Sequence, residues 1–218
     1  MSRVLCLSML VLIGLPPMVC NAVVSCDKDQ PARHADFRRV TATFSGDTLS
    51  FSMPSRFEQV NLDRLAALES PSSQYRVWAV PAQQAGRASE TIEIRSMRQP
   101  AGSQGKMSVS RLAGIHGKIY MTSCPDTFSV GTLPSLIRDT PGDETYAVVL
   151  ACGDVRTAAP RHSDSSVSYV FRGAQDFYVM TWSVMAEPRS TVLDIDRDQW
   201  QARLTSLFPL IVCPVPIK

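Results

Sequence analysis

The sequence predicts an α+β fold, in which helices pack on an antiparallel β-sheet of about seven strands in an α/β/α sandwich-like arrangement. Two observations support this prediction. Segments in which apolar and polar residues alternate recur along the chain, and such alternation is typical of strands with one buried face. The segment from Ser166 to Phe208 also predicts a β-hairpin followed by an amphipathic helix, so that helix and sheet belong to one unit.

The first 22 residues have the layout of a secretory signal peptide. Arg3 is the only charged residue before Asp27, residues 4–15 are apolar, and residues 20–22 (CNA) end in small side chains. The apolar stretch is shorter than the roughly 20 residues that span a membrane. We therefore expect cleavage after Ala22, with residues 23–218 forming a single α+β domain that is periplasmic or extracellular.

A second processing site competes with this one. Residues 23–26 (VVSC) resemble a bacterial lipobox, in which the cysteine, here Cys26, is lipidated and becomes the N-terminus. Cleavage after Ala22 fits better behind the helix-breaking pair Pro16-Pro17. Lipidation at Cys26 stays the alternative, and the protein would be attached to a membrane only in that case.

Removal of the signal peptide leaves four cysteines, which are Cys26, Cys124, Cys152 and Cys213. An even number of cysteines in an exported domain indicates disulfide bonds. We favour Cys152–Cys213 and Cys26–Cys124, because Cys152 ends an apolar strand and Cys213 follows the C-terminal helix. A lipid on Cys26 would leave one thiol unpaired, which favours cleavage after Ala22. A zinc site is the alternative for these cysteines, but they are widely spaced and no C-x-x-C is present, so we expect no metal and no cofactor.

The first half of the domain predicts strands. Residues 40–44 and 49–53 alternate on either side of the turn sequence Ser45-Gly46-Asp47, which predicts a hairpin. Further elements are expected at residues 62–69 (a helix capped by Asn61), 75–80 (a strand) and 90–97 (a strand with Ile92 and Ile94 facing inward).

The segment from Leu49 to Val60 (LSFSMPSRFEQV) consists of a strand that ends at a proline, with an aromatic residue three positions later. It resembles the opening of PsbP/Mog1-like domains. The resemblance implies an α/β/α sandwich built on an antiparallel sheet and a protein that binds partners. It implies no shared catalytic residues, so none is assigned here.

The middle of the chain is less regular. Residues 99–118 contain four glycines and predict a loop, with a short helix from Ser108. A strand at 118–123, a short helix at 132–137, a buried central strand at 146–152 and a loop at 153–165 are expected to follow.

The segment 166–208 gives the clearest pattern. Residues 166–172 alternate, and residues 177–185 are apolar on both faces, which predicts a central strand covered on both sides. Asp196 has a glutamine three residues on, as in a capping box, and predicts the start of a helix. Its apolar positions lie on one stripe at Trp200, Leu204, Leu207 and Phe208, and Pro209 ends it.

Few residues indicate catalysis. Ser103 and Lys106 match the S-x-x-K motif, in which the amine takes the proton of a nucleophilic serine, but Gly105 argues against the helix that this motif needs. The histidines His34, His116 and His162 are far apart in sequence, and no G-x-S-x-G motif accompanies them. Asp194 and Asp196 are explained as residues at a helix start.

Removal of Arg3 with the signal peptide leaves a net charge of about +1, which gives no electrostatic case for nucleic-acid binding. The main hypothesis is an exported, non-catalytic binding or inhibitor protein with a protein partner, which neutralises a toxin or assists an envelope system. The loops at 99–118 and 154–165 are the expected contact surfaces. One alternative is an envelope hydrolase that uses Ser103 and Lys106 or one of the histidines. The other is a lipid-anchored envelope component.

Overall fold

The structure is a computed structural model, and it describes residues 35–60, 72–81, 89–98, 107–134, 144–158, 160–174 and 176–215. These residues form an α+β fold, as the sequence predicted. Its main sheet is antiparallel and has seven strands, in the spatial order β3 (Glu58–Gln59), β4 (Ser73–Ala79), β5 (Glu90–Arg98), β9 (Asp176–Ala186), β8 (Ser163–Arg172), β7 (Thr145–Cys152) and β6 (Phe128–Leu133).

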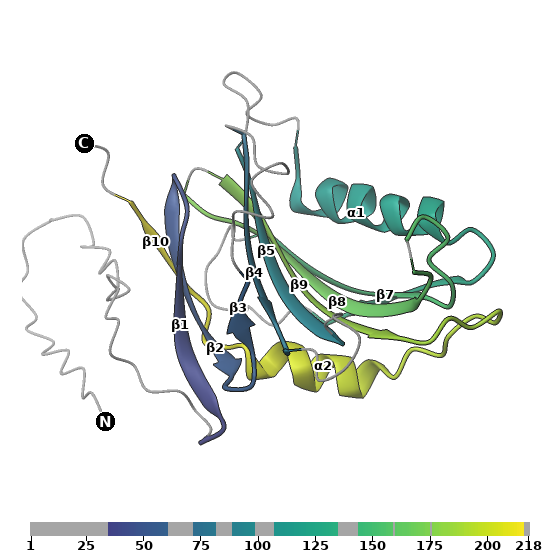
Figure 1. Ribbon diagram of the computed structural model, residues 1–218. Coiled ribbons are helices and arrows are strands. Elements are labelled where there is room, and N and C mark those ends of the chain that lie inside the picture. The colour runs from purple at the N-terminus through teal and green to yellow at the C-terminus, as the bar shows by residue number, and fades with distance from the viewer. Residues whose placement is uncertain are drawn as a thin grey trace, which may run out of the picture.

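The other described elements cover the two faces of this sheet. Helix α1 (Val109–Ser123) lies on one face, over β7 and β8, and helix α2 (Arg197–Ser206) lies on the opposite face (Figure 1). A three-stranded antiparallel sheet packs on the same side as α2; its strands are β1 (Phe37–Thr43), β2 (Asp47–Pro54) and β10 (Ile211–Pro214), with β2 in the middle.

Strand β9 occupies the centre of the main sheet, between β5 and β8, as its two-sided apolar pattern predicted. Tyr178, Met180 and Trp182 enter the larger core between the two sheets and α2. Phe177 and Val179 enter the smaller core beneath α1. The residues of α2 that enter the larger core are those expected from the stripe in the sequence.

Strand β8 differs from the expectation of a strand with one face in solvent. Val167, Tyr169 and Phe171 point into the larger core, as predicted. Ser166 and Ser168 on the other face are also fully buried, because α1 covers them. Hydroxyl side chains on this face therefore meet a helix, and this contact builds the site described below.

The sequence misplaced the elements around α1. Residues 118–123 were expected to form a strand, but they form the end of α1, which begins at the N-cap Ser108 and is much longer than the short helix predicted there. The Ser108 Oγ accepts a hydrogen bond from the backbone N–H of Arg111 at 3.1 Å. The alternation in six residues (KIYMTS) is too short to distinguish a period of 2 from one of 3.6.

Three strands were not predicted, and the first is the two-residue strand β3. Residues 132 and 133, expected to begin a helix, are the end of β6, which pairs along its whole length with β7. Strand β10 follows α2 and pairs with β2. Strands β5 and β7 begin within a residue of the predicted positions, and Ile92 and Ile94 face inward as expected. The helix predicted at 62–69 lies outside the described residues.

A buried carboxylate joins the two sheets. Asp47, the first residue of β2, accepts hydrogen bonds from the Tyr178 hydroxyl at 3.0 Å and from the backbone N–H of Ala174 at 3.2 Å. Gly173 lies against it, so that a Cβ at this position would come 2.3 Å from Asp47 Oδ2. The turn between β8 and β9 is thereby fixed against the small sheet.

Candidate functional site

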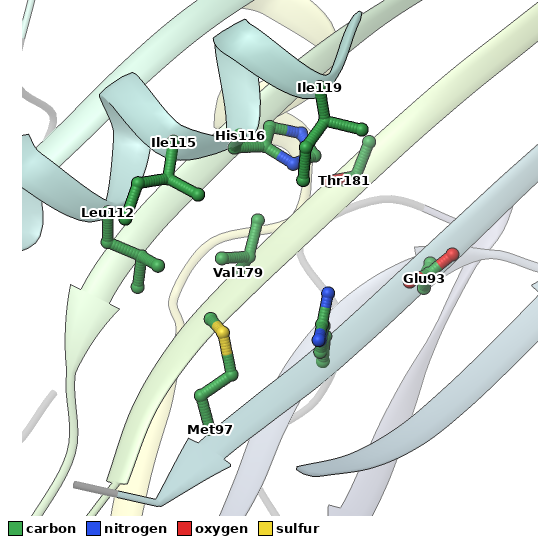
Figure 2. A pocket seen from close by; sticks show the side chains of 9 residues that line it. Glu93, Met97, Leu112, Ile115, His116, Ile119, Val179 and Thr181 are labelled. Carbon is green, nitrogen blue, oxygen red and sulfur yellow. The ribbon is translucent and has the colours of Figure 1, made fainter. Parts of the chain in front are cut away.

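The candidate site is a pocket of about 190 Å³ between α1 and strands β5 and β9. Helix α1 covers β7 and β8 (Figure 1), and the pocket lies between this helix and the neighbouring strands β5 and β9 (Figure 2). The lining residues come from these three elements: Glu93, Arg95 and Met97 of β5, Val179 and Thr181 of β9, and Leu112, Ile115, His116 and Ile119 of α1.

One side of the pocket is apolar. Leu112, Ile115 and Ile119 follow one another at intervals of three and four residues and therefore lie on one stripe of α1. Leu112 is buried, whereas Ile115 and Ile119 are 44% and 54% exposed. Figure 2 shows the two isoleucines on the helix above Val179 of β9. Large apolar side chains that border a pocket are typical of a binding surface.

The helix is attached to the sheet by polar contacts behind this apolar stripe. His116 Nε2 lies 2.9 Å from Ser168 Oγ, which in turn lies 3.0 Å from Thr181 Oγ1, so that a chain of hydrogen bonds crosses from α1 to β8 and β9. Burial, followed by the positive charge of Arg95, lowers the pKa of His116 from 6.5 to about 4. The imidazole is therefore neutral at neutral pH.

His116 and Ser168 lie close together, but Ser168 is not a nucleophile that a substrate could reach. The side chain of Ser168 is 0% exposed beneath the helix, and it is not among the residues that line the pocket. Thr181 has the one hydroxyl group among the described lining residues, and this group is hydrogen-bonded to Ser168. The chain of hydrogen bonds positions α1 on the sheet.

A second polar contact lies one helical turn further along. The Tyr120 hydroxyl donates a hydrogen bond to Asp164 Oδ2 at 2.9 Å and accepts one from Ser166 Oγ at 3.1 Å. Burial, and then the charge of Asp164, raises the pKa of Tyr120 above its ordinary value of 10. The phenol is protonated throughout the physiological range and joins the end of α1 to β8.

Two charged residues of β5 complete the pocket. Burial raises the pKa of Glu93 above its ordinary value, and the positive charge of Arg95 opposes this effect. Arg95 makes its own contacts with strand β4: its Nε donates a hydrogen bond to Ser73 Oγ at 3.1 Å, and its guanidinium lies 5.1 Å from the centre of the Tyr75 ring. Figure 2 shows Glu93 on the side of the pocket away from the helix.

A disulfide bond joins Cys124, directly after α1, to Cys152 at the end of β7. The predicted bonds Cys152–Cys213 and Cys26–Cys124 are therefore wrong. Strand β6, which the sequence did not predict, explains the difference: it begins shortly after Cys124, and its first residue pairs with Cys152. Cys213 is also in a disulfide bond, whose other half lies outside the described residues.

The structure separates the other predicted site residues from this pocket. His162 lies in the loop before β8, where its Nδ1 is 3.3 Å from the Pro160 carbonyl oxygen. Asp196 caps α2, as predicted, and accepts a hydrogen bond from the Gln199 backbone N–H at 2.9 Å. The remaining candidates lie outside the described residues; they are Cys26, His34, Ser103 and Lys106.

Within the described ranges, His, Cys, Asp and Glu side chains do not gather in threes or more as they would around a metal ion. In the same ranges, neither helix has the length and apolar character needed to cross a bilayer. Of the loops expected as contact surfaces, residues 109–118 belong to α1 and contribute Leu112, Ile115 and His116 to the pocket. In the other loop, Arg161 forms an ion pair with Asp154.

Comparison with known proteins yields matches in solved structures alone. No family model and no curated protein matches the chain. The crystal structure of the Saccharomyces cerevisiae Ran-binding protein Mog1p matches with 11% sequence identity and a TM-score of 0.39, over 79% of this chain and 86% of Mog1p. A point mutant of Mog1 matches with 11% identity and a TM-score of 0.40, over 79% of this chain and 85% of the other.

The solution structure of the cyanobacterial PsbP protein CyanoP from Synechocystis sp. PCC 6803 also matches. The sequence identity is 12% and the TM-score 0.42, over 84% of this chain and 92% of CyanoP. Mog1 and PsbP structures are thus among the structural neighbours of the chain, as the resemblance at residues 49–60 implied. We transfer no function and no site residue from them.

Proposed function

We propose that this protein is an exported, non-catalytic binding protein, and that the pocket between α1, β5 and β9 receives an apolar side chain of a protein partner. The observation that supports this proposal best is the pair Ile115 and Ile119, which remain exposed at the border of a pocket. Burial of such a side chain against a partner stabilises a complex by about 1.5–3 kcal/mol.

The size of the pocket favours a side chain over a free small molecule. Pockets for drug-sized ligands have volumes of about 300–1,000 Å³. A pocket of about 190 Å³ with one open side is smaller and suits a single large apolar side chain that remains attached to a partner. The accessible lining also offers no activated nucleophile, because Ser168 is buried and Thr181 is hydrogen-bonded to it.

The sequence supports export to the periplasm or the outside of the cell, where the partner would be a secreted toxin that this protein neutralises or a component of an envelope system. Once Cys6 and Cys20 leave with the signal peptide, Cys26 is the one cysteine left to pair with Cys213. We expect this bond and, with it, an unlipidated Cys26. N-terminal sequencing and peptide mapping of the mature protein test both; a fatty acid on Cys26 would contradict them.

The decisive experiment is a pull-down of the tagged, exported protein from its own envelope, repeated with two variants. Ile119→Asp places a charge at the pocket, and Val192→Asp places one at a side chain that is equally exposed, at 54%, in the segment before α2. We expect one stoichiometric partner with the wild type and with Val192→Asp. With Ile119→Asp the affinity for the purified partner should fall by about 10- to 150-fold.

Equal recovery of the partner by both variants would show that the pocket is not the binding site. The absence of a partner in the wild-type preparation would contradict the binding function. Ile119 and Val192 are exposed to the same degree, so that a loss confined to Ile119→Asp does not reflect a general effect of an added charge.

A further inference from the structure

The chemistry of the occupant follows from a charged group of the pocket that has no hydrogen bond or ion pair with the described residues. Glu93 lines the pocket, and within the described part of the chain no hydrogen bond or ion pair reaches its carboxyl group. A carboxylate that is partly removed from water without such a contact costs free energy, and a bound group can recover that free energy if it is a cation or a hydrogen-bond donor.

The neighbours of Glu93 do not supply this contact. Arg95, two residues along the same strand, directs its guanidinium to Ser73 and to the ring of Tyr75, both on β4. Its charge acts on Glu93 without an ion pair, and the pKa of Glu93 stays raised by burial despite that charge. Met97, further along β5, is apolar and offers no donor.

The other polar groups of the lining have contacts of their own. His116 is neutral and contacts Ser168, and the Thr181 hydroxyl contacts the same serine. Among the described residues, the charges of the pocket are therefore one cation that already has contacts within the protein, Arg95, and one carboxylate that has no hydrogen bond or ion pair, Glu93. An occupant that is complementary to this arrangement combines an apolar part, for the side formed by Ile115 and Ile119, with a positive charge.

We infer that the partner's apolar side chain is accompanied by a lysine or arginine, whose cationic group binds the Glu93 carboxylate while the apolar group lies against Ile115 and Ile119. This inference rests on the proposed function, because it assigns the chemistry of a segment bound in the same pocket. Aliphatic stems of lysine and arginine suit such a border, since their methylene groups can lie on apolar surface while the charged end reaches the carboxylate.

Three small probes separate the apolar and the charged contributions: n-hexylammonium, n-hexanol and n-hexanoate have the same alkyl chain with a positive, neutral or negative end. Each is titrated into the mature, disulfide-bonded chain, labelled at its isoleucine methyl groups, and followed by NMR at Ile115 and Ile119. We expect hexylammonium to bind about tenfold more tightly than hexanol, as one charge-assisted hydrogen bond allows, and hexanoate to bind most weakly.

The variant Glu93→Gln keeps the size of the side chain and removes its charge, and it should bind hexylammonium and hexanol equally. Glu187→Gln is the matched control, because Glu187 is exposed after the end of β9 and away from the lining; it should keep the tenfold preference. Unchanged preference in Glu93→Gln would contradict the inference.

The outcomes distinguish the inference from the proposed function. Equal binding of hexylammonium and hexanol to the wild type, or a preference for hexanoate, overturns the cationic occupant and leaves the apolar pocket in place. If no probe shifts the methyl signals of Ile115 or Ile119, the pocket does not accept an apolar group, and both the inference and the pocket-based function fall.

Discussion

Acid should weaken the fold through His116, and the substitution His116→Gln should remove this part of the pH dependence. The folded protein holds the pKa of His116 at about 4, whereas an unfolded chain has a histidine pKa of about 6.5. The difference of about 2.5 pKa units corresponds to about 3 kcal/mol of unfolding free energy at neutral pH. The glutamine side chain does not titrate, and its amide is able to contact Ser168 in place of the imidazole.

The sign follows from proton uptake. Between about pH 6.5 and pH 4 the unfolded chain binds a proton at His116 and the folded protein does not, so that the unfolding free energy falls as the pH falls. Below about pH 4 the folded protein binds the proton as well, and the loss ends. Glu93 acts in the opposite direction, because its raised pKa makes the folded protein take up a proton before the unfolded chain does.

Urea unfolding followed by tryptophan fluorescence, at pH values from about 7 to 4, measures the effect. The stability difference between wild type and His116→Gln isolates the histidine, because Glu93 and the other carboxylates titrate in both proteins. We expect the unfolding free energy of the wild type, relative to that of His116→Gln, to fall by about 3 kcal/mol from about pH 7 to about pH 4. A difference that is constant with pH, or an NMR titration of the His116 ring with a midpoint near 6.5, would refute the reasoning.

Two further predictions concern the framework around the site. Replacement of Cys124 and Cys152 together by alanine opens a link between residues 28 positions apart, and should lower the unfolding free energy by about 3.6 kcal/mol in the chain-entropy treatment; equal urea midpoints would contradict it. Gly173→Ala should lower the unfolding free energy by about 1–3 kcal/mol, because the new Cβ would lie 2.3 Å from Asp47. Gly114→Ala, with open space around it in α1, should raise the unfolding free energy by about 0.5–1 kcal/mol. Melting temperatures in the reverse order would contradict this packing.

The sequence predicted those elements that have a long apolar pattern or two separate signals. The strand at 177–185 is apolar on both faces over nine residues, and the structure places β9 at the centre of the sheet. Helix α2 has both a cap and a stripe, and it lies where these signals indicated. The start of α1 at Ser108 was predicted, but its length was not, because Gly114 and Gly117 resemble loop residues, although a buried N-terminal turn and contacts to β8 hold the helix.

The candidate site was hidden for a different reason. The sequence favoured a surface position for His116, with catalysis as the alternative, whereas the structure shows it on the side of α1 that faces the sheet, in contact with Ser168. Ser166 and Ser168 looked like the solvent face of a strand. The sheet register pairs them with Ser183 and Thr181, so that hydroxyl side chains form a patch across two central strands. Such a patch indicates that a helix with polar side chains could pack on it. That signal needs the register, which depends on tertiary contacts.

The polar contacts of α1 also explain why the pocket exists. Apolar attraction is not directional, so that a helix held by apolar contacts alone would move until Ile115 and Ile119 were buried against β5 and β9. Hydrogen bonds have defined geometry, and those of His116 and Tyr120 both end on β8.

The two ends of α1 are also attached near β7. The Val109 N–H at the start of α1 donates a hydrogen bond to Glu144, next to β7, and Cys124 at its end is bonded to Cys152 of β7. The helix is therefore held over β7 and β8 at four points along its length. This attachment leaves the two isoleucines exposed at the border of the pocket, with Glu93 on the side of the pocket away from the helix.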